Sequence, residues 1–224
     1  LGDVYKRQIR RPSIGDLEFR SVNFRYPGQE VDTLVGVNLK IQKGEKVAIL
    51  GRNGSGKTTL IKLSSGLFGS TDGIVTYDGV DTKQIHDEDL SSSIGIVLQD
   101  VHLFSGSVIE NITMGREGIT QEDIVAAEKV SGLDEFLGKM PGGYELVLQD
   151  KGNGLSGGQR QAIAITRALV HKPSHFILDE PTSAMDMNAE QLFIKNFKEI
   201  YQDSTLIVVS HRMPLVNLVD RIIV

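Results

Sequence analysis

A glycine-rich stretch at residues 51–58 constrains the fold of this chain more than any other feature. It reads Gly-Arg-Asn-Gly-Ser-Gly-Lys-Thr and fits the pattern G-x-x-x-x-G-K-[ST]. A short apolar run at 46–50, typical of a buried strand, precedes it, and a helical pattern at 57–67 follows. Glycines let successive backbone N–H groups turn toward one anion, and the helix N-terminus adds its positive dipole end. The stretch predicts a nucleoside triphosphate site, with Lys57 on the β- and γ-phosphates and Thr58 on Mg²⁺.

Two adjacent acids, Asp179 and Glu180, follow the apolar run 176–178, which is also typical of a buried strand. A carboxylate placed here can hold Mg²⁺ through water, and a second can polarise an attacking water as a general base. A bare pair of acids in a strand-end turn is usually only solvated. The phosphate-binding stretch in the same chain favours the functional interpretation, with Asp179 on the metal and Glu180 as the base. His175 is expected to begin the strand.

The N-terminal half alternates in a way that predicts strands. Apolar residues alternate over 17–26 with one slip, which indicates a strand with a bulge, and they alternate again over 37–41. Further strands are predicted at 74–77, ending at a turn formed by Asp78 and Gly79, and at 94–98.

Residues 101–150 have a helical pattern instead, which predicts a separate helical lobe. Ser107 and Thr120 begin sequences that resemble capping boxes, and Gly132 is a plausible helix end. Beyond the lobe, helices and strands alternate at 159–171, 176–178, 189–201, 206–209 and near 222. This alternation favours an α/β sheet that binds its ligand at the carboxyl ends of the strands.

Composition excludes several classes of protein. The 224 residues are enough for one large domain with a substantial core. The chain has 24 Lys and Arg against 29 Asp and Glu, a net charge of −5, so no nucleic-acid partner is expected. It has no Cys, which excludes a disulfide framework, a thiolate metal site and a cysteine nucleophile. No apolar run approaches the ~20 residues of a membrane span, so any membrane anchor must come from another segment or chain.

Both ends of the chain resemble cut ends. The first Met is Met114, and residues 1–8 (LGDVYKRQ) resemble a translated sequencing adapter, so we expect them to be non-native. The chain stops at Val224 inside an apparent strand. We therefore expect a fragment that is truncated at its C-terminus.

The sequence Leu155-Ser156-Gly157-Gly158-Gln159, here called the signature motif, lies between the phosphate-binding stretch and the acidic pair. In this order the motifs resemble the nucleotide-binding domain of ATP-binding cassette (ABC) proteins, over about residues 17–224. The resemblance implies an α/β fold, a P-loop NTPase (ABC ATPase) core with an N-terminal antiparallel β subdomain and an inserted α-helical subdomain at about 101–155. The ABC ATPase domain is expected to span 15–224.

The resemblance also implies a partner chain. The signature motif begins a helix, where the Ser156 hydroxyl and the glycine amides would form a second anion site. That site would close over the ATP of a second ABC ATPase domain, so that two chains form a head-to-tail homodimer around two ATP molecules.

Other positions match the family one by one. Tyr26 would stack on adenine, although a tyrosine at the edge of the core is the alternative. Gln99 would contact Mg²⁺ and water and sense a transmembrane partner. Asp186, in the loop Ser183-Ala184-Met185-Asp186, would communicate across the dimer, and His211 would lie near the γ-phosphate. The residues expected to bind ATP are Tyr26, Gly51, Arg52, Asn53, Gly54, Ser55, Gly56, Lys57, Thr58 and Thr59; those expected in catalysis are Glu180, His211 and Gln99; those expected to bind Mg²⁺ are Thr58, Gln99 and Asp179.

Two segments narrow the kind of ABC protein. Residues 99–112 are similar to the corresponding segment of exporters, and residues 150–154 are similar to the exporter loop that contacts the transmembrane domain. Together with 24–30, 51–52 and 181–186, they resemble type I secretion ATPases, which export proteins across the bacterial inner membrane. The resemblance implies a domain on the cytoplasmic face of that membrane, with a transmembrane domain fused upstream. The alternatives are a lipid, drug or peptide exporter, a stand-alone import subunit and a non-transport ABC ATPase.

Overall fold

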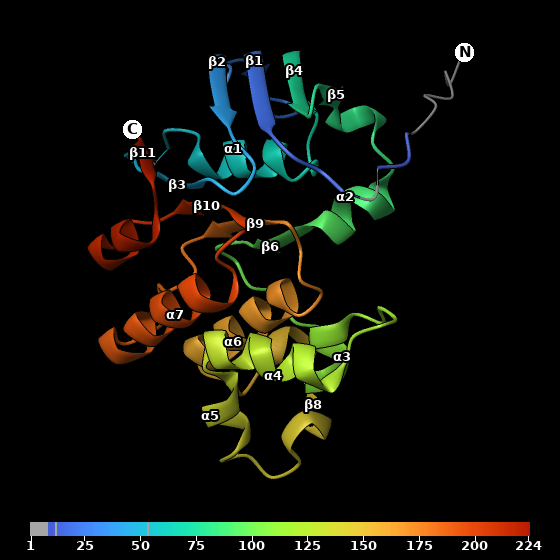
Figure 1. The fold of residues 1–224 in the computed structure, drawn as a ribbon, viewed down its shortest axis with the longest axis vertical. Coiled ribbons are helices and arrows are strands. Elements are labelled where there is room, and N and C mark those ends of the chain that lie inside the picture. Colours follow the sequence, from blue (N-terminus) through green and yellow to red (C-terminus); the bar gives the residue numbers. More distant parts are fainter. Residues whose placement is uncertain (1–8, 12, 53) are drawn as a thin grey trace.

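An antiparallel sheet forms one end of the molecule in the computed structural model (Figure 1). The structure describes residues 9–11, 13–52 and 54–224; the expected adapter segment 1–8 and Asn53 lie outside the described residues. The strands run in the order β2-β1-β4-β5, and their bounds are β1 Leu17–Phe24, β2 Leu34–Ile41, β4 Asp72–Tyr77 and β5 Val80–Asp81. The predicted bulge is confirmed, because the pairing register of β1 with β2 shifts between Phe19 and Val22.

A parallel sheet lies at the centre, in the order β11-β3-β10-β9-β6. Its strands are β3 Lys46–Ile49, β6 Ile94–Val97, β9 His175–Asp179, β10 Thr205–Val209 and β11 Arg221–Ile223. Every residue of β9 and β10 is buried, as the uninterrupted apolar runs predict for strands covered on both faces. Because the strands are parallel, the residues that follow β3, β9 and β10 meet at one edge of the sheet.

Helix α1 (Lys57–Ser64) packs between the two sheets (Figure 1). It is three residues shorter than the predicted 57–67. Gly66 has a left-handed backbone (φ 74°), which turns the chain away from the helix. A side chain would not fit at this position, because a Cβ would come within 2.4 Å of Leu90 Cδ2.

The predicted helical lobe is present at the opposite end of the molecule (Figure 1). It contains α3 (Val108–Thr113), α4 (Gln121–Ser131) and α5 (Leu133–Leu137). Ser107 and Thr120 both form complete capping boxes, and Gly132 ends α4 with φ 74°, as the sequence predicts. The lobe also contains a short antiparallel strand pair that the sequence did not indicate. It is formed by β7 (Gly106–Ser107) and β8 (Val147–Leu148).

Two longer helices connect the lobe to the parallel sheet. They are α6 (Gly157–Leu169), on which α3, α4 and α5 pack, and α7 (Met187–Ile200), which also contacts α4. The remaining elements are α2 (Asp87–Ser93) and the 3₁₀ turns η1 (Thr82–Gln84), η2 (Gly143–Glu145), η3 (Asp150–Gly152) and η4 (Met213–Leu218). Within the described ranges, no helix has both the length and the apolar character that a membrane crossing requires.

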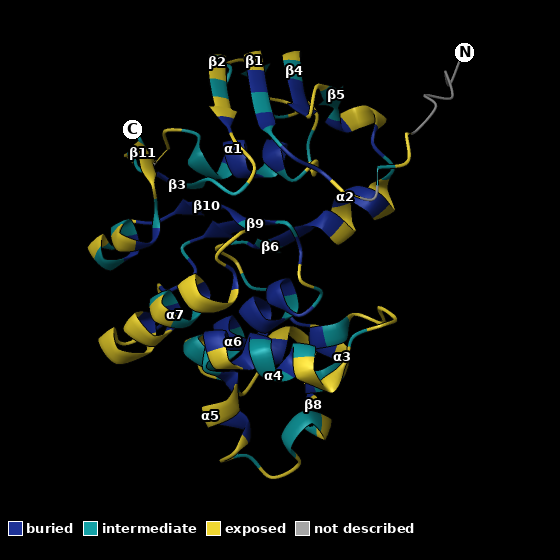
Figure 2. Ribbon diagram, in the orientation of Figure 1, coloured by how far each residue is buried: buried dark blue, intermediate teal, exposed yellow. Residues whose placement is uncertain are grey.

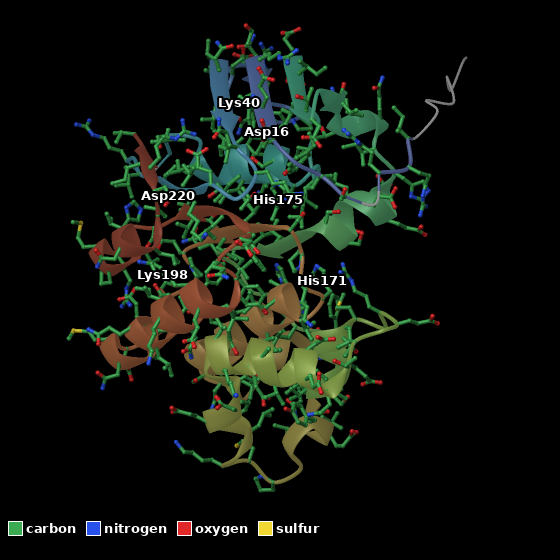
Figure 3. The ribbon with its side chains drawn as sticks, in the orientation of Figure 1. Asp16, Lys40, His171, His175, Lys198 and Asp220 are labelled. Atoms are coloured by element: carbon green, nitrogen blue, oxygen red, sulfur yellow. The ribbon has the colours of Figure 1, made fainter. Side chains whose placement is uncertain are left out.

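The core has two parts, one on each face of the parallel sheet. Figure 2 shows the central strands in the buried colour and much of the outer helical surface exposed. On the helical face, Phe176 packs edge-on against Phe197 and Tyr201. On the other face, His175 (labelled in Figure 3) begins β9 as predicted. Its Nε2 lies 2.8 Å from the Gly15 carbonyl oxygen, and its ring packs edge-on against Tyr77. Burial lowers the pKa of His175 to about 4, so its imidazole is neutral.

Candidate functional site

A cavity of about 530 Å³ opens at the carboxyl ends of β9 and β10, beside the phosphate-binding stretch. It brings together residues from the two predicted motifs, which are more than a hundred positions apart in sequence. Its lining residues are Thr33, Gly54, Gly56, Lys57, Thr58, Thr59, Gln99, Asp179, Glu180, Ser183, Val209 and His211. Three lining residues were not expected from the sequence, because they do not belong to the motifs that define a phosphate site: Thr33, Ser183 and Val209.

The Lys57 ammonium group folds back on the first two residues of the phosphate-binding stretch. Lys57 Nζ donates to the carbonyl oxygens of Gly51 at 2.8 Å and Arg52 at 2.9 Å. Gly56, with φ 90°, precedes α1, and a Cβ there would come within 2.6 Å of Leu34 Cδ2. Glycine is therefore required at this position by backbone conformation and by space. Asn53, which was expected to bind ATP, lies outside the described residues.

Thr58 and Asp179 meet directly. Thr58 Oγ1 donates to Asp179 Oδ2 at 2.8 Å, across a sequence separation of 121 residues. Burial raises the pKa of Asp179, and the Thr58 hydrogen bond and the Lys57 charge act in the opposite direction. The site therefore offers a hydroxyl and a carboxylate oxygen side by side, next to the lysine expected to bind phosphate.

The Glu180 carboxylate lies between Ser210 and His211. Ser210 Oγ donates to Glu180 Oε2 at 3.3 Å, and the His211 backbone N–H donates to Oε1 at 3.2 Å. His211 Nε2 lies 3.6 Å from the same Oε1. Glu180 itself has a left-handed backbone (φ 51°), which is uncommon outside glycine and asparagine. The segment after β10 thus orients the predicted base, a role for Ser210 that the sequence did not indicate.

Gln99 lines the cavity at the phosphate-binding stretch, whereas Tyr26 does not. Gln99 is exposed and lines the cavity with Asp179 and Glu180. Tyr26 does not line it: its ring packs edge-on against Phe24 and Phe68, and its hydroxyl lies 3.0 Å from Thr59 Oγ1, a residue of the lining. Tyr26 therefore sits at the rim of the site through Thr59, within a small aromatic cluster.

The signature motif forms a separate surface. Ser156 caps α6 by accepting from the Gln159 N–H at 3.2 Å, and Gln159 Oε1 accepts from the Ser156 N–H at 2.8 Å. Ser156, Gly158, Gln159 and Asp186 line a cavity of about 630 Å³ that shares no lining residue with the one at the phosphate-binding stretch. In one chain, the signature motif and the loop with Asp186 face a different opening from the Lys57 site.

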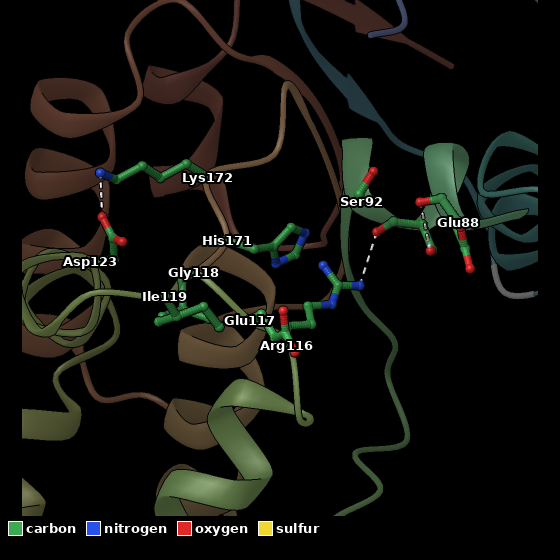
Figure 4. Close-up of a pocket in the computed structure, with 11 residues that line it drawn as sticks. Glu88, Ser92, Arg116, Glu117, Gly118, Ile119, Asp123, His171 and Lys172 are labelled. Atoms are coloured by element: carbon green, nitrogen blue, oxygen red, sulfur yellow. Dashed lines mark hydrogen bonds and ion pairs between the residues drawn. The ribbon is translucent and has the colours of Figure 1, made fainter. Parts of the chain in front are cut away.

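A cavity of about 910 Å³, larger than the one at the phosphate-binding stretch, lies away from this chemistry, between α2, the loop after α3 and the end of α6. Figure 4 shows the Arg116 guanidinium beside the His171 ring, and Lys172 paired with Asp123. Arg116 Nη2 also donates to the Ser91 carbonyl oxygen at 3.1 Å. Burial first, and then the Arg116 charge, lower the pKa of His171 to about 4. This cavity lacks the phosphate-binding loop and the acidic pair, so size does not identify the site.

Comparison with known proteins agrees with this geometry. Residues 34–183 match the family model described as ABC transporter. The chain is 42% identical over 94% of its length to the cyclolysin secretion/processing ATP-binding protein CyaB of Bordetella pertussis. It is 41% identical over its whole length to the leukotoxin translocation ATP-binding protein LktB of Mannheimia glucosida, and 40% to the alpha-hemolysin translocation ATP-binding protein HlyB of Escherichia coli. The match spans 30% of the first relative and 33% of the other two, so the chain spans about a third of their length.

A solved structure supports the fold. The chain superposes on a bacterial Atm1-family ABC exporter with ATP bound at a TM-score of 0.86 and 29% identity, covering 97% of this chain and 40% of that one. The fold expected from the sequence is confirmed in its antiparallel sheet, its parallel sheet and its helical lobe. The chain therefore belongs to the ABC transporter family.

Proposed function

We propose that this domain hydrolyses ATP to power type I secretion of proteins across the bacterial inner membrane. The observation that carries the ATPase part is the convergence of Lys57, Thr58, Asp179 and Glu180 on one cavity at the carboxyl edge of the parallel sheet. The domain spans 15–224 in this proposal, with its helical subdomain at about 101–155. A phosphate-binding loop, a metal-binding pair and a general base are the parts that phosphoryl transfer to water requires.

Glu180 acts as the general base in this mechanism. The water oxygen attacks the γ-phosphorus, the bond from that phosphorus to the bridging oxygen breaks, and ADP leaves with the electron pair. A proton of the water passes to the Glu180 carboxylate. Ser210 and the His211 backbone hold that carboxylate, and the His211 imidazole lies within reach of the same oxygen.

The residues present fit a magnesium ion. Thr58 Oγ1 and Asp179 Oδ2 lie 2.8 Å apart, and Gln99 lines the same cavity, so the donors are the hydroxyl, carboxylate and amide oxygens that Mg²⁺ prefers. When bound, the ion would neutralise the negative charge that develops on the phosphate oxygens. Thr58 holds the Asp179 carboxylate in place for it, with Gln99 at the open side.

Two copies of the chain complete each site in the head-to-tail arrangement. The support is that the signature motif and Asp186 open away from the Lys57 site of their own chain. Ser156 and the N-terminus of α6 then contact the ATP bound at Lys57 of the partner chain. Loss of the γ-phosphate, which both chains contact, loosens the dimer, and this opening drives a transmembrane domain.

The secretion part of the proposal rests on the relatives and on the exporter-like segments. The three relatives at 40–42% identity are described as a secretion/processing protein and as toxin translocation proteins. The domain would lie at the cytoplasmic face of the membrane, with Gln99 and the loop 150–154 facing the transmembrane partner. A lipid, drug or peptide exporter remains the second candidate, since the solved exporter matches the same fold.

Two variants test the ATPase and the dimer. Glu180→Gln should bind ATP and hydrolyse it at least about 100-fold more slowly, with exposed Glu122→Gln as control. Ser156→Arg should leave ATP binding to the monomer unchanged and abolish ATP-induced dimerisation, measured by light scattering. Thr120→Arg changes a helix N-cap of another helix and should dimerise normally. Wild-type turnover in Glu180→Gln would contradict the base assignment, and normal dimers of Ser156→Arg would contradict the head-to-tail site.

Sequencing the DNA that flanks this coding region tests the secretion assignment. Membrane-spanning segments encoded directly upstream, with genes for a membrane-fusion protein and a repeat-rich toxin nearby, are expected. A start codon close upstream with no such segments would contradict a fused exporter.

A further inference from the structure

We propose that Gln161 is a positioning residue that couples the two ATP sites of the dimer, an inference that rests on the head-to-tail arrangement proposed above. Gln161 follows the signature motif by two residues on α6, and only 5% of its surface is exposed. A buried amide of this kind is retained in a core only when its polar atoms are satisfied. The Gln161 amide bonds both the backbone of Glu180, which faces the ATP of its own chain, and the loop with Asp186, which faces the partner chain in the proposed dimer.

One end of the Gln161 amide holds the general base. Its Nε2 donates to the Glu180 carbonyl oxygen at 2.8 Å and lies 3.3 Å from Ser183 Oγ. The other end holds the loop with Asp186: Oε1 accepts from the Ala184 N–H at 2.9 Å. A single planar group therefore fixes the backbone of Glu180 and of the loop to the same point on α6.

Glu180 depends on such fixation. Its left-handed backbone (φ 51°) costs energy for a residue with a side chain and persists only where neighbouring contacts define it. Its N–H donates to the Val209 carbonyl oxygen at 2.8 Å, and its carbonyl oxygen accepts from Ser183 N at 3.2 Å as well as from Gln161. Gln161 supplies the shorter of the two hydrogen bonds to that carbonyl oxygen, and it is the one that comes from α6.

The signature motif is also packed against the loop, without intervening side chains. A Cβ on Gly158 would lie 3.2 Å from the Ala184 carbonyl oxygen, and one on Gly157 would lie 3.6 Å from Ala184 Cβ. A shift of the N-terminus of α6 toward the loop would therefore press on Ala184, whose N–H is bound by Gln161. This contact makes the signature motif, the loop and the Glu180 backbone one mechanical unit.

In the dimer, the two ends of this unit face different ATP molecules. The signature motif contacts the nucleotide held by the partner chain, and the Glu180 carboxylate faces the nucleotide held at Lys57 of its own chain. Docking of the partner's ATP on α6 then orients Glu180 through Gln161. Hydrolysis at one site becomes dependent on occupancy of the other, which appears as a Hill coefficient above 1 for ATP.

The first test uses Gln161→Met in the 224-residue chain. Methionine keeps the length of the side chain and removes both hydrogen-bonding groups. We expect kcat to fall about tenfold and the Hill coefficient to approach 1, while the Kd of a fluorescent ATP analogue stays within twofold of wild type. The control is Thr166→Val on the same helix: Thr166 is fully buried and bonds Ala162 and Ser131, away from Glu180, so this variant should lower Tm only.

The second test separates positioning from simple damage. In Gln161→Glu the new carboxyl keeps an acceptor for the Ala184 N–H and can donate to the Glu180 carbonyl oxygen only when protonated. Burial beside that oxygen raises the pKa of the introduced group. The ratio of its kcat to the wild-type kcat should therefore rise as the pH is lowered from 8 to 6, and the ratio for Gln161→Met should stay constant.

The outcomes are distinct. If the wild-type chain hydrolyses ATP cooperatively and both variants keep its kcat and its Hill coefficient, the coupling role is overturned. A fall in kcat with an unchanged Hill coefficient would also overturn it. A wild-type chain that neither dimerises nor hydrolyses ATP would overturn the proposed function, and this inference with it.

Discussion

Asn111, in α3, is expected to be one of the positions of the helical lobe at which a substitution lowers stability most. It is 1% exposed. Its Oδ1 accepts from the Phe104 N–H at 2.9 Å and from Arg167 Nη2 at 3.0 Å. Its Nδ2 donates to the carbonyl oxygens of Phe104 at 2.9 Å and Ser107 at 3.1 Å. The amide thereby holds the segment that follows Gln99 against α3 and α6.

The cost of Asn111→Leu follows from these four hydrogen bonds. Leucine has nearly the same volume, so the change opens no large cavity and its effect comes from the lost bonds. Each of the three neutral hydrogen bonds contributes about 1 kcal/mol net, and the one from the charged Arg167 guanidinium at least about 1.5 kcal/mol, so the free energy of unfolding should fall by at least about 4 kcal/mol. For a chain of 224 residues, this corresponds to a fall in Tm of about 8–16 °C.

Urea unfolding followed by circular dichroism measures this loss. Asn196→Leu is the matched control, because Asn196 is partly exposed and donates one hydrogen bond, to the Lys129 carbonyl oxygen at 2.6 Å. That variant should lose at most about 1 kcal/mol. A loss below about 1 kcal/mol in Asn111→Leu would refute the view that this amide fixes the segment after Gln99.

Three further changes test the phosphate-binding stretch and the core. Lys57→Ala should weaken ATP binding by at least about tenfold, since it removes a charge that pairs with phosphate, and unchanged affinity by titration would contradict the assignment. Gly56→Ala should destabilise the fold and weaken ATP binding together, because φ is 90° and the new Cβ would meet Leu34 at 2.6 Å. The pKa of His175 is about 4 when folded and about 6.5 when unfolded, so the unfolded state binds the additional proton and stability falls as pH drops from about 6.5 toward 4, by up to about 3 kcal/mol. In His175→Gln, the free energy of unfolding from urea titrations should depend less on pH between about 6.5 and 4. An unchanged dependence would contradict the assignment of this slope to His175.

Local sequence patterns were sufficient to predict most of the helices and strands. The capping boxes at Ser107 and Thr120 and the glycine stop at Gly132 are short-range features, and each marks a real helix boundary. The apolar runs that became β9 and β10 were visible because strands buried on both faces lack polar residues. The proximity of Thr58 to Asp179 followed from the rule that parallel strands deliver their loops to one edge.

Other parts of the site depend on contacts that no local pattern encodes. Gln161 and Asn111 look like ordinary polar residues of helices, and their roles come from backbone groups of Glu180 and Phe104 elsewhere in the chain. Tyr26 was expected to stack on adenine, and its packing against Phe68 could not be read from its own segment. Side chains that bond distant backbone groups are found only when the tertiary fold is known.

The strand order of the parallel sheet has a consequence for how the chain is made. Strand β3, which leads into the phosphate-binding stretch, lies between β10 and β11, and Val47 pairs with Ile207 and Arg221. During synthesis, β3 therefore leaves the ribosome long before its neighbours exist, with its apolar side chains uncovered. Pairings of such high sequence separation fold slowly and expose aggregation-prone strands. The nascent chain should therefore depend on chaperones until β10 has emerged, and binding of ATP should become possible only after that point.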